Sequence, residues 1–578
     1  MAAPPRPDAP GASFASNLAR FGCLLGLLLL AGCERRESQT AASAVLITLD
    51  TTIPQSLDMY GQDRGITPNL MEFSKECVAY RRARAVSPIT LVSHASMLTG
   101  LYPPRHGIRD NGHLPLPGAA ETLAERASGA GFQTAAFVSA VVLAAPFGLD
   151  QGFDVYDEPR GSRAAFVGGV AERGREEVTA AAIGWLDRKK EGQPFFIWVH
   201  YFDPHYPYEP PPEFQEQAGG SLYLGEVAAV DAALGELLAR LRSEPGYDRM
   251  TIAVVGDHGE GLGRHGEQYH SLLAYDSTLL VPLLIKHPLG RGAGKWIPNA
   301  VSVVDIFPTL LDGMGLGAAP DVDGLDLLAG DLPQGRGVYF ESYFGYLRFG
   351  WSPLAGWADN RTKYLHGRTP ELFDLKADPG ENKNIHSADD PRTRTARRAI
   401  EQIAARPALT RDALESQTPA GGADLSHLGY LGATGNETGL PHPLADVDLP
   451  APRESLGEYT AIMAALRAID EGDPSAAIAG LRVITEQNPR NVYAHELLGK
   501  MLIETGQPRL ALVPLQAILD RGQDRATLRQ SLASACASLG RFREALDHLD
   551  HADEMCPGEE ATLRLRARIK KEMEEGGK

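Results

Sequence analysis

The chain has 578 residues, more than one compact hydrophobic core usually serves, so we expect at least two domains. It is 43% hydrophobic and 22% charged, a composition that excludes disordered and fibrous proteins. The formal net charge of −18 argues against a nucleic-acid-binding protein, because such proteins need a basic surface.

The N-terminal residues are typical of a secretion signal. Arg20 precedes an apolar run at residues 24–30, which is too short to span a bilayer as a helix. The Leu-Ala-Gly-Cys that ends at Cys33 resembles a lipobox, in which the cysteine is lipidated and becomes the first residue of the mature protein. We therefore predict a membrane-anchored bacterial lipoprotein on the periplasmic or cell-surface side of the envelope. The alternative is a signal anchor that is never cleaved.

Beyond a short polar tether, apolar β-rich runs alternate with helical stretches. Continuous apolar strands separated by helices predict an α/β fold with a mostly parallel central sheet sandwiched by helices. In such sheets, ligands bind beyond the carboxyl ends of the strands. The strand-like runs are residues 45–49, 134–138, 195–200, 251–256 and 281–286, and the polar residues just past their ends are Asp50, Asp203, His205, Asp257 and His258.

Two of these strand ends indicate a metal site. Asp50 follows the first run, and Asp257 with His258 follows the run at 251–256. Carboxylate and imidazole groups from neighbouring strand ends suit a divalent cation with mixed oxygen and nitrogen ligands. Each segment alone is weak evidence, since an Asp at a strand end often only caps the next helix.

The C-terminal part is predicted to be an all-α repeat domain. A 34-residue period resembles tetratricopeptide repeats, with glycine in the turn between two helices and a small alanine where the second helix packs closely. Three units and a charged final helix at 559–575 predict a capped array whose concave face binds a peptide or protein partner. Two alternatives stay open: a helical bundle with coincidental spacing, and an array that only covers part of the catalytic domain. The repeated residues are Gly472, Gly506 and Gly540 together with Ala477, Ala511 and Ala545.

Three cysteines remain outside the leader, too few for a disulfide scaffold. Cys536 and Cys556 either pair in an oxidising compartment or stay as two buried free thiols. The predicted domains are a signal peptide at 1–32, a tether at 33–43, a catalytic domain at 44–405, a linker at 406–452 and the repeats at 453–578.

The segment between the two metal-binding stretches carries a family resemblance. Residues 87–107 read SPITLVSHASMLTGLYPPRHG, and this stretch resembles the nucleophile motif of the sulfatase family, in which Cys or Ser, x, Pro, x and Arg precede a Thr-Gly. The resemblance continues in order through residues 200–208, 257–266 and 371–382. It covers about residues 43–390 and implies the fold of the alkaline phosphatase superfamily.

Departures from the motif change the expected chemistry. Thr90 stands at the nucleophile position, Val92 replaces the proline, and His94 replaces the arginine or merely caps the following helix. Sulfatases convert Cys or Ser to formylglycine, so no formylglycine is expected here. The superfamily uses a threonine nucleophile in phosphoethanolamine transferases, lipoteichoic acid synthases and nucleotide pyrophosphatases, which favours phosphorus. Thr51 stands where the family often has a second Asp, and it would be a weaker oxygen ligand.

The resemblance implies roles for individual residues. Asp50, Asp257 and His258 would hold the metal, with Thr90 as a nucleophile that bridges to it, since a metal can lower the pKa of a bound hydroxyl. The ion could be Ca, Mg, Mn or Zn, because all tolerate such ligands.

Three further residues are implied to act on the substrate. Asn111 would steady the developing oxyanion, His205 would protonate the leaving group, and His270 would contact the non-bridging oxygens. If Asp203 and His270 bind a second metal instead, the site becomes the two-metal kind used for in-line phosphoryl transfer.

These features predict a sulfatase-family, metal-dependent hydrolase of a sulfate or phosphate ester that uses Thr90 as nucleophile. Two alternatives stay open. One is a phosphotransferase that moves a phosphoryl-linked head group to a glycan or lipid. The other is a catalytically inactive, anion-binding scaffold.

Overall fold

The computed structural model describes residues 1–2, 41–111, 114–159, 173–410 and 440–576. By their contacts they fall into two units, Met1–Ala41 and Ala42–Lys578, and every element below belongs to the second. The predicted signal peptide and Cys33 lie outside the described residues. Residues 411–439 of the predicted linker also lie outside them. Within the described residues, no helix has the length and apolar character needed to cross a membrane.

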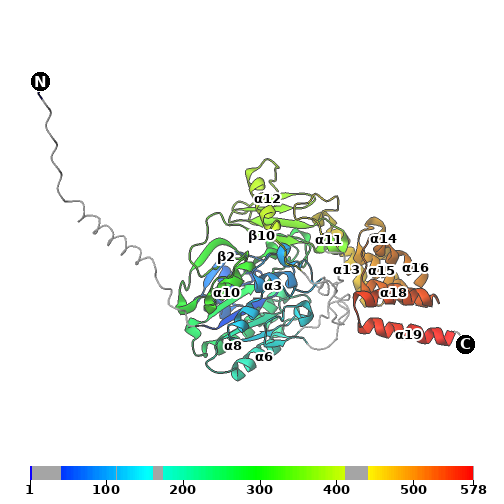
Figure 1. Ribbon diagram of the computed structural model, residues 1–578, viewed down its shortest axis with the longest axis horizontal. Helices are drawn as coiled ribbons and strands as arrows, with labels where there is room; N and C mark the ends of the chain where they lie inside the picture. The colour runs from blue at the N-terminus through cyan, green and yellow to red at the C-terminus, as the bar shows by residue number, and fades with distance from the viewer. Residues whose placement is uncertain (3–40, 112–113, 160–172, 411–439, 577–578) are drawn as a thin grey trace. The chain divides into compact units, whose positions relative to one another are not determined.

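A nine-stranded, mostly parallel sheet forms the centre of the catalytic region, which confirms the predicted fold class (Figure 1). The strand order is β4-β3-β5-β1-β6-β8-β2-β7, with β9 paired to β2. Neighbours from β4 to β6 run parallel, and β8 pairs antiparallel with both β6 and β2. The strands are β1 (Ala44–Leu49), β2 (Val78–Arg84), β3 (Gln133–Phe137), β4 (Val155–Asp157), β5 (Phe195–Tyr201), β6 (Thr251–Gly256), β7 (Leu280–Val281), β8 (Leu283–Lys286) and β9 (Trp296–Ser302).

Helices cover both faces of this sheet because alternate residues of a strand point to opposite faces. In β1, Ala44 and Leu46 join the hydrophobic cluster that contains helices α3 (Thr90–Thr99), α5 (Leu123–Gly129) and α10 (Ile306–Met314). Val45, Ile47 and Leu49 join the cluster that contains α2 (Pro68–Ser74), α6 (Arg175–Arg188) and α8 (Leu222–Arg242). Every residue of β1 is buried, as a strand covered on both faces must be.

A second, antiparallel sheet follows, which the sequence reasoning did not anticipate. Its order is β10-β11-β12-β13, with the first helix of this region, α11, in the connection after β10. Helix α12 packs on β11 and β12. The elements are β10 (Val338–Ser342), α11 (Phe344–Phe349), β11 (Leu354–Ala358), β12 (Thr362–His366), β13 (Glu371–Asp374) and α12 (Pro391–Ala404).

Consecutive paired helices make up the C-terminal region, as predicted. Gly472, Gly506 and Gly540 adopt φ values of 77°, 73° and 72° in the turns between helices, a conformation that suits glycine. The three predicted alanines are fully buried. The tetratricopeptide assignment itself stays a prediction. The helices are α13 (Leu456–Asp470), α14 (Pro474–Gln487), α15 (Val492–Glu504), α16 (Pro508–Leu519), α17 (Ala526–Ser538), α18 (Phe542–Met555) and α19 (Glu560–Gly576).

The helical region contacts the segment around α11. Asn488 donates a 2.7 Å hydrogen bond to the carbonyl of Phe349, and the indole of Trp351 donates one of 3.1 Å to Glu458. Cys77, Cys536 and Cys556 are buried and form no disulfide with one another, so the predicted pairing of Cys536 with Cys556 does not hold.

Candidate active site

The predicted metal-binding residues Asp50, Asp257 and His258 meet at the carboxyl ends of two adjacent strands. Strands β5, β1 and β6 are parallel neighbours, with Leu49 opposite both Tyr201 and Gly256. Asp50 directly follows β1 and Asp257 directly follows β6, so the two residues lie side by side. Asp50 Oδ1 and Asp257 Oδ2 each lie 3.5 Å from His258 Nε2, and all three residues are fully buried.

The hydrogen bonds and burial of His258 define its charge state. Its Nδ1 lies 3.1 Å from the Gly259 carbonyl, which can only accept, so Nδ1 carries a proton. Burial lowers the pKa of the ring well below its usual value, so the ring is neutral and Nε2 presents a lone pair. That lone pair faces two carboxylate oxygens, and Asp257 Oδ2 accepts no hydrogen bond from the described residues. Three buried acceptors this close repel one another unless a proton or a cation lies among them. These residues therefore fit the predicted divalent metal.

Burial sets the electrostatics of the same cluster. Desolvation raises the pKa of Asp257 well above its usual value, opposed by hydrogen bonds from the backbone of His258 and Thr51. It also lowers the pKa of His258 well below 6.5, with a contribution from neighbouring His270. A bound cation would favour both the ionised carboxyl and the neutral imidazole.

Thr90 projects into the cluster from the first position of α3. Its Oγ1 lies 3.2 Å from His258 Nε2, and the side chain is buried. The helix is fixed to strand β6 by Ser93, whose hydroxyl donates 2.6 Å to the Asp257 carbonyl. The predicted nucleophile and the predicted ligands therefore share one site.

The Asn111 side chain contacts the first turn of α3 from outside the helix. Its Oδ1 accepts a 2.9 Å hydrogen bond from the backbone N–H of Leu91, the residue after Thr90. The neighbouring Asp110 is held by Arg348 at 2.9 Å and in turn accepts the backbone N–H of Asn111. This network holds the Asn111 amide against Leu91, next to the predicted nucleophile Thr90, while its role toward an oxyanion stays a prediction.

His270 and His205 follow His258 as a chain of imidazoles. Ring centroids are 4.6 Å apart between His258 and His270, and 5.1 Å apart between His270 and His205. His270 Nδ1 pairs with the buried Glu260 at 3.2 Å. His205 Nδ1 lies 2.6 Å from the Tyr206 carbonyl, so its Nε2 is free to accept a proton. Burial, with a smaller effect of His270, lowers the pKa of His205 to about 3.

Two other candidates have different partners from those expected. Asp203 forms a 2.9 Å ion pair with Arg175, and the described residues form no second metal-ligand group with His270. The Thr51 hydroxyl donates to the Pro204 carbonyl, and its backbone N–H donates to Asp257 Oδ1 at 3.3 Å. Thr51 thus orients a predicted ligand through its backbone instead of acting as a ligand itself.

The sequence reasoning missed His200, and it left His94 without a role. His200 Nε2 lies 3.6 Å from Asp50 Oδ2, and His94 Nδ1 lies 3.7 Å from Asp257 Oδ2. Both rings are fully buried and stand at a right angle with centroids 4.9 Å apart. Burial lowers the pKa of His94 to about 4, so this ring is neutral. The position of His200 depends on the register of β5 against β1, which the motifs do not contain, while His94 lies in helix α3.

A second group of metal-capable side chains lies between α17 and α18. Cys536, Glu544 and His548 bring ligand atoms within 4.8 Å of one another. However, Arg541 pairs with Glu544 at 2.5 Å, and Arg529 Nη1 lies 3.1 Å from His548 Nδ1. Resident arginines already satisfy two of these groups, in contrast to the strand-end cluster.

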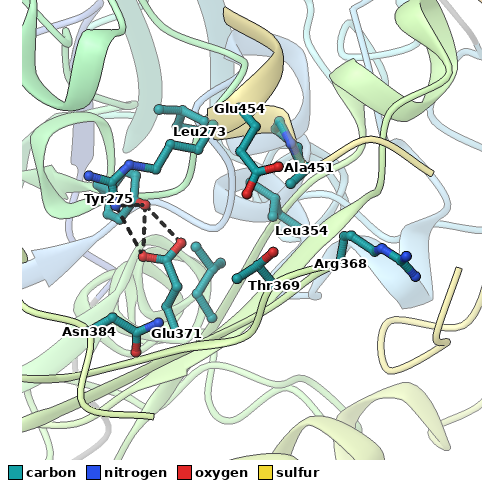
Figure 2. A pocket seen from close by; sticks show the side chains of 12 residues that line it. Leu273, Tyr275, Leu354, Arg368, Thr369, Glu371, Asn384, Ala451 and Glu454 are labelled. Carbon is teal, nitrogen blue, oxygen red and sulfur yellow. Dashed lines mark hydrogen bonds and ion pairs between the residues drawn. The ribbon is translucent and has the colours of Figure 1, made fainter. Parts of the chain in front are cut away.

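A cavity of about 410 Å³ lies away from the predicted catalytic residues, none of which lines it (Figure 2). Its walls come from residues 273–275, the second sheet and residues 451–454. The Tyr275 hydroxyl donates 2.8 Å to Glu371 Oε1, and Arg453 Nη1 donates 3.2 Å to the Tyr275 oxygen. Dashed lines in Figure 2 mark these interactions among the residues that line the cavity.

The amino-acid sequence and the fold of this chain are similar to those of several known proteins. The family model described as Sulfatase matches residues 43–316. The ulvan-active sulfatase of Formosa agariphila is 27% identical over 409 residues, which cover 61% of this chain and 78% of that protein. A solved complex with the substrate D-glucosamine-2-N,6-O-disulfate is 20% identical with a TM-score of 0.54, covering 63% of this chain and 97% of that one. The phosphonate monoester hydrolase of Agrobacterium radiobacter is 24% identical with a TM-score of 0.53, covering 63% and 94%.

Proposed function

We propose that this protein is a sulfatase-family hydrolase that cleaves a sulfate or phosphate ester, with Thr90 as its nucleophile and a divalent cation at Asp50, Asp257 and His258; the match of residues 43–316 to the Sulfatase family model supports this proposal. The observation that carries the proposal is the 3.2 Å approach of Thr90 Oγ1 to His258 Nε2, inside a cluster of acceptors that fits a cation. The cation would supply positive charge that favours ionisation of a nearby hydroxyl and offsets charge on the ester oxygens.

The chain's own residues account for the remaining steps. The Thr90 oxygen forms a bond to sulfur or phosphorus as the bond to the ester oxygen breaks, and the alcohol leaves with a proton. Water then releases sulfate or phosphate from Thr90 and restores the hydroxyl. We assign protonation of the leaving alcohol to His205: its ring is neutral at rest, with Nδ1 bonded to the Tyr206 carbonyl, so Nε2 can take up the proton that Thr90 releases and pass it to the leaving oxygen. His270, held by Glu260, is assigned to the non-bridging oxygens, and the Asn111 amide to the oxyanion.

The test is a hydrolysis assay on an aryl sulfate, an aryl phosphate monoester and an aryl phosphodiester, with Ca²⁺, Mg²⁺, Mn²⁺ or Zn²⁺ supplied. Thr90→Val keeps the volume of the side chain and removes the nucleophile. Thr99→Val is the matched control, because Thr99 is buried in the same helix and its hydroxyl bonds, among the described residues, to the Ala95 carbonyl and the Leu101 N–H. We expect Thr90→Val to lose at least about a thousand-fold in kcat/KM and Thr99→Val to stay close to wild type.

Other outcomes would decide between the remaining functions. Turnover unchanged in Thr90→Val would contradict the nucleophile assignment. Ester cleavage that needs an added alcohol acceptor would favour a phosphotransferase. No turnover with any of the four metals would favour an anion-binding scaffold. The shared fold includes proteins named for sulfur and for phosphorus esters, so the substrate profile must choose between them.

We also propose that a lipid on Cys33 anchors the protein to the bacterial envelope and that the C-terminal helices bind a protein or peptide. Labelling with a fatty-acid analogue, lost in Cys33→Ala, would support the anchor. Absence of label on wild type would contradict it.

A further inference from the structure

The two carboxylate oxygens of Asp50 face two different imidazoles. Oδ1 lies 3.5 Å from His258 Nε2, within the metal cluster, and Oδ2 lies 3.6 Å from His200 Nε2. His200 has no task in the reaction proposed above, although it is fully buried beside a proposed ligand. The ring nitrogen that carries the His200 proton therefore affects how the Asp50 carboxylate is oriented.

Strand pairing aligns His200 with two other buried groups. Strands β1 and β5 run parallel, with Thr48 opposite His200 and Leu46 opposite Trp198. Since alternate residues of a strand share one face, Trp198, Thr48 and His200 lie together on the same face of the sheet. The Trp198 indole N–H donates 3.0 Å to Thr48 Oγ1, and Thr48 Oγ1 lies 3.1 Å from His200 Nδ1. All three side chains are buried completely.

The chemistry of these groups gives the chain one direction. An indole N–H can only donate, so Thr48 Oγ1 accepts from Trp198. The Thr48 hydroxyl proton then has His200 Nδ1 as its acceptor at 3.1 Å, which places the His200 proton on Nε2. The opposite tautomer would leave the Thr48 proton without this acceptor and would turn a lone pair of His200 toward the Asp50 carboxylate. Both changes are unfavourable in a buried site.

The ring of His94 holds this arrangement by packing. Its centroid lies 5.3 Å from Trp198 and 4.9 Å from His200, while its Nδ1 donates to the Thr90 carbonyl at 2.8 Å. His94 therefore packs from helix α3 against Trp198 and His200 without forming a hydrogen bond with either of them.

We propose that Trp198, Thr48 and His200 form a one-way hydrogen-bond chain that turns the His200 N–H toward Asp50 Oδ2 and so leaves Asp50 Oδ1 for the cation. They are positioning residues, and the inference rests on the metal site of the proposed function. Outer partners of metal-ligating carboxylates typically contribute about 10–100-fold to metal affinity.

The first test is metal affinity, measured by isothermal titration calorimetry on the full chain after chelator treatment. The probe is whichever of Ca²⁺, Mg²⁺, Mn²⁺ or Zn²⁺ wild type binds most tightly. Thr48→Val removes the donor while it keeps the volume, and Thr48→Ser restores the hydroxyl. The matched control is Thr251→Val, because Thr251 is fully buried in β6 and its hydroxyl makes no hydrogen bond to the described residues.

We expect Thr48→Val to raise the metal Kd by about 10–100-fold, and Thr48→Ser and Thr251→Val to leave it near wild type. Equal affinity of Thr48→Val and wild type would overturn the role of the chain alone. If wild type bound none of the four metals, the metal site of the proposed function would fail, and this role with it.

The second test reads the tautomer directly and needs no metal. Nitrogen-15 NMR of the histidine-labelled, metal-free chain, assigned with His200→Gln, distinguishes protonated from unprotonated ring nitrogens. We expect the proton of His200 on Nε2 in wild type and in Thr48→Ser, with Nδ1-protonated ring gaining population in Thr48→Val. A proton on Nδ1 in wild type would overturn the proposed direction.

Discussion

Two buried groups of carboxylates in this protein are neutralised differently. Between the two sheets, Asp276 forms ion pairs with Arg84 at 2.7 Å and Lys363 at 3.0 Å, and Lys363 also pairs with Glu381 at 2.7 Å. At the strand ends, Asp50 and Asp257 face histidine nitrogens instead, and among the described residues Asp257 pairs with no lysine or arginine. Two negative and two positive side chains balance the first group, whereas burial keeps the histidines of the second neutral.

This difference distinguishes a group that carries its own counter-charges from the group proposed to bind a cation. Burial would raise the pKa of Asp276, but Arg84 and Lys363 hold it well below its usual value. That group carries its own counter-charges and joins elements of both sheets. The strand-end group has no such counter-charge for Asp257, so its ionised form depends on a bound cation.

The largest expected effect is on the metal-dependent group. Asp257→Asn removes one predicted ligand and half of the buried negative charge that Asp50 and Asp257 carry together when both are ionised. We expect the affinity for the metal to fall by more than about a hundred-fold, beyond what loss of an outer partner costs, and ester hydrolysis to fall with it. Calorimetric titration and the aryl ester assay measure the two losses. Retention of both would place the cation elsewhere.

The next effect is on the balanced group. Arg84→Met leaves Asp276 buried with only Lys363 as partner, so we expect the free energy of unfolding to fall by about 3–5 kcal/mol. Urea unfolding of the metal-free protein at pH 7 measures the change. A loss below about 1 kcal/mol would mean that Lys363 alone compensates Asp276 and that the proposed balance is wrong.

A third carboxyl group sharpens the comparison, because it is neutralised by a proton. Glu267 accepts the backbone N–H groups of Leu272 and Leu273 at 2.8 and 3.1 Å, and no lysine or arginine among the described residues pairs with it. Burial, opposed by these bonds, raises its pKa to about 8. The folded state therefore keeps a proton that the unfolded state releases near pH 4.5.

The stability that this proton provides is complete below pH 4.5 and is lost as the pH rises toward 8. Glu267→Gln keeps an acceptor and does not titrate. Relative to this variant, we expect the wild-type unfolding free energy to fall by up to about 1.4 kcal/mol per pH unit between pH 5 and 8. Urea unfolding at several pH values measures the slope, with the exposed Glu213→Gln as control. Parallel pH profiles would contradict the raised pKa.

The smallest expected effect is on stability without metal. Asp257→Asn removes a poorly compensated charge, so we expect the metal-free variant to unfold within about 1 kcal/mol of wild type or to be slightly more stable. The same urea measurement after chelation checks this. A loss comparable to that of Arg84→Met would show that Asp257 has an unrecognised structural partner and would remove the contrast between the two groups.

The sequence predicts the strand-end residues well because their position needs only local pattern. Asp50, Asp257 and His258 follow apolar runs directly, and the parallel sheet brings such ends together. Thr90 was placed by its distance from the Thr-Gly of the family motif, and the structure puts it against His258.

The features that the sequence does not predict depend on contacts between residues that are distant in sequence. His200 lies inside an apolar run, and only the register of β5 against β1 places it opposite Thr48 and beside Asp50. Asp203 looks like a strand-end ligand, but Arg175, 28 residues away in sequence, pairs with it. The second sheet was missed because its short strands alternate with loops that carry no strong period.

The central claim is that a cation occupies the strand-end group beside Thr90. The most direct measurement is an anomalous difference map from crystals soaked with Mn²⁺, which accepts both oxygen and nitrogen ligands. We predict a peak bounded by Asp50 Oδ1, Asp257 Oδ2 and His258 Nε2, with Thr90 Oγ1 facing it. An empty strand-end group, or a peak only at Cys536, Glu544 and His548, would contradict the account.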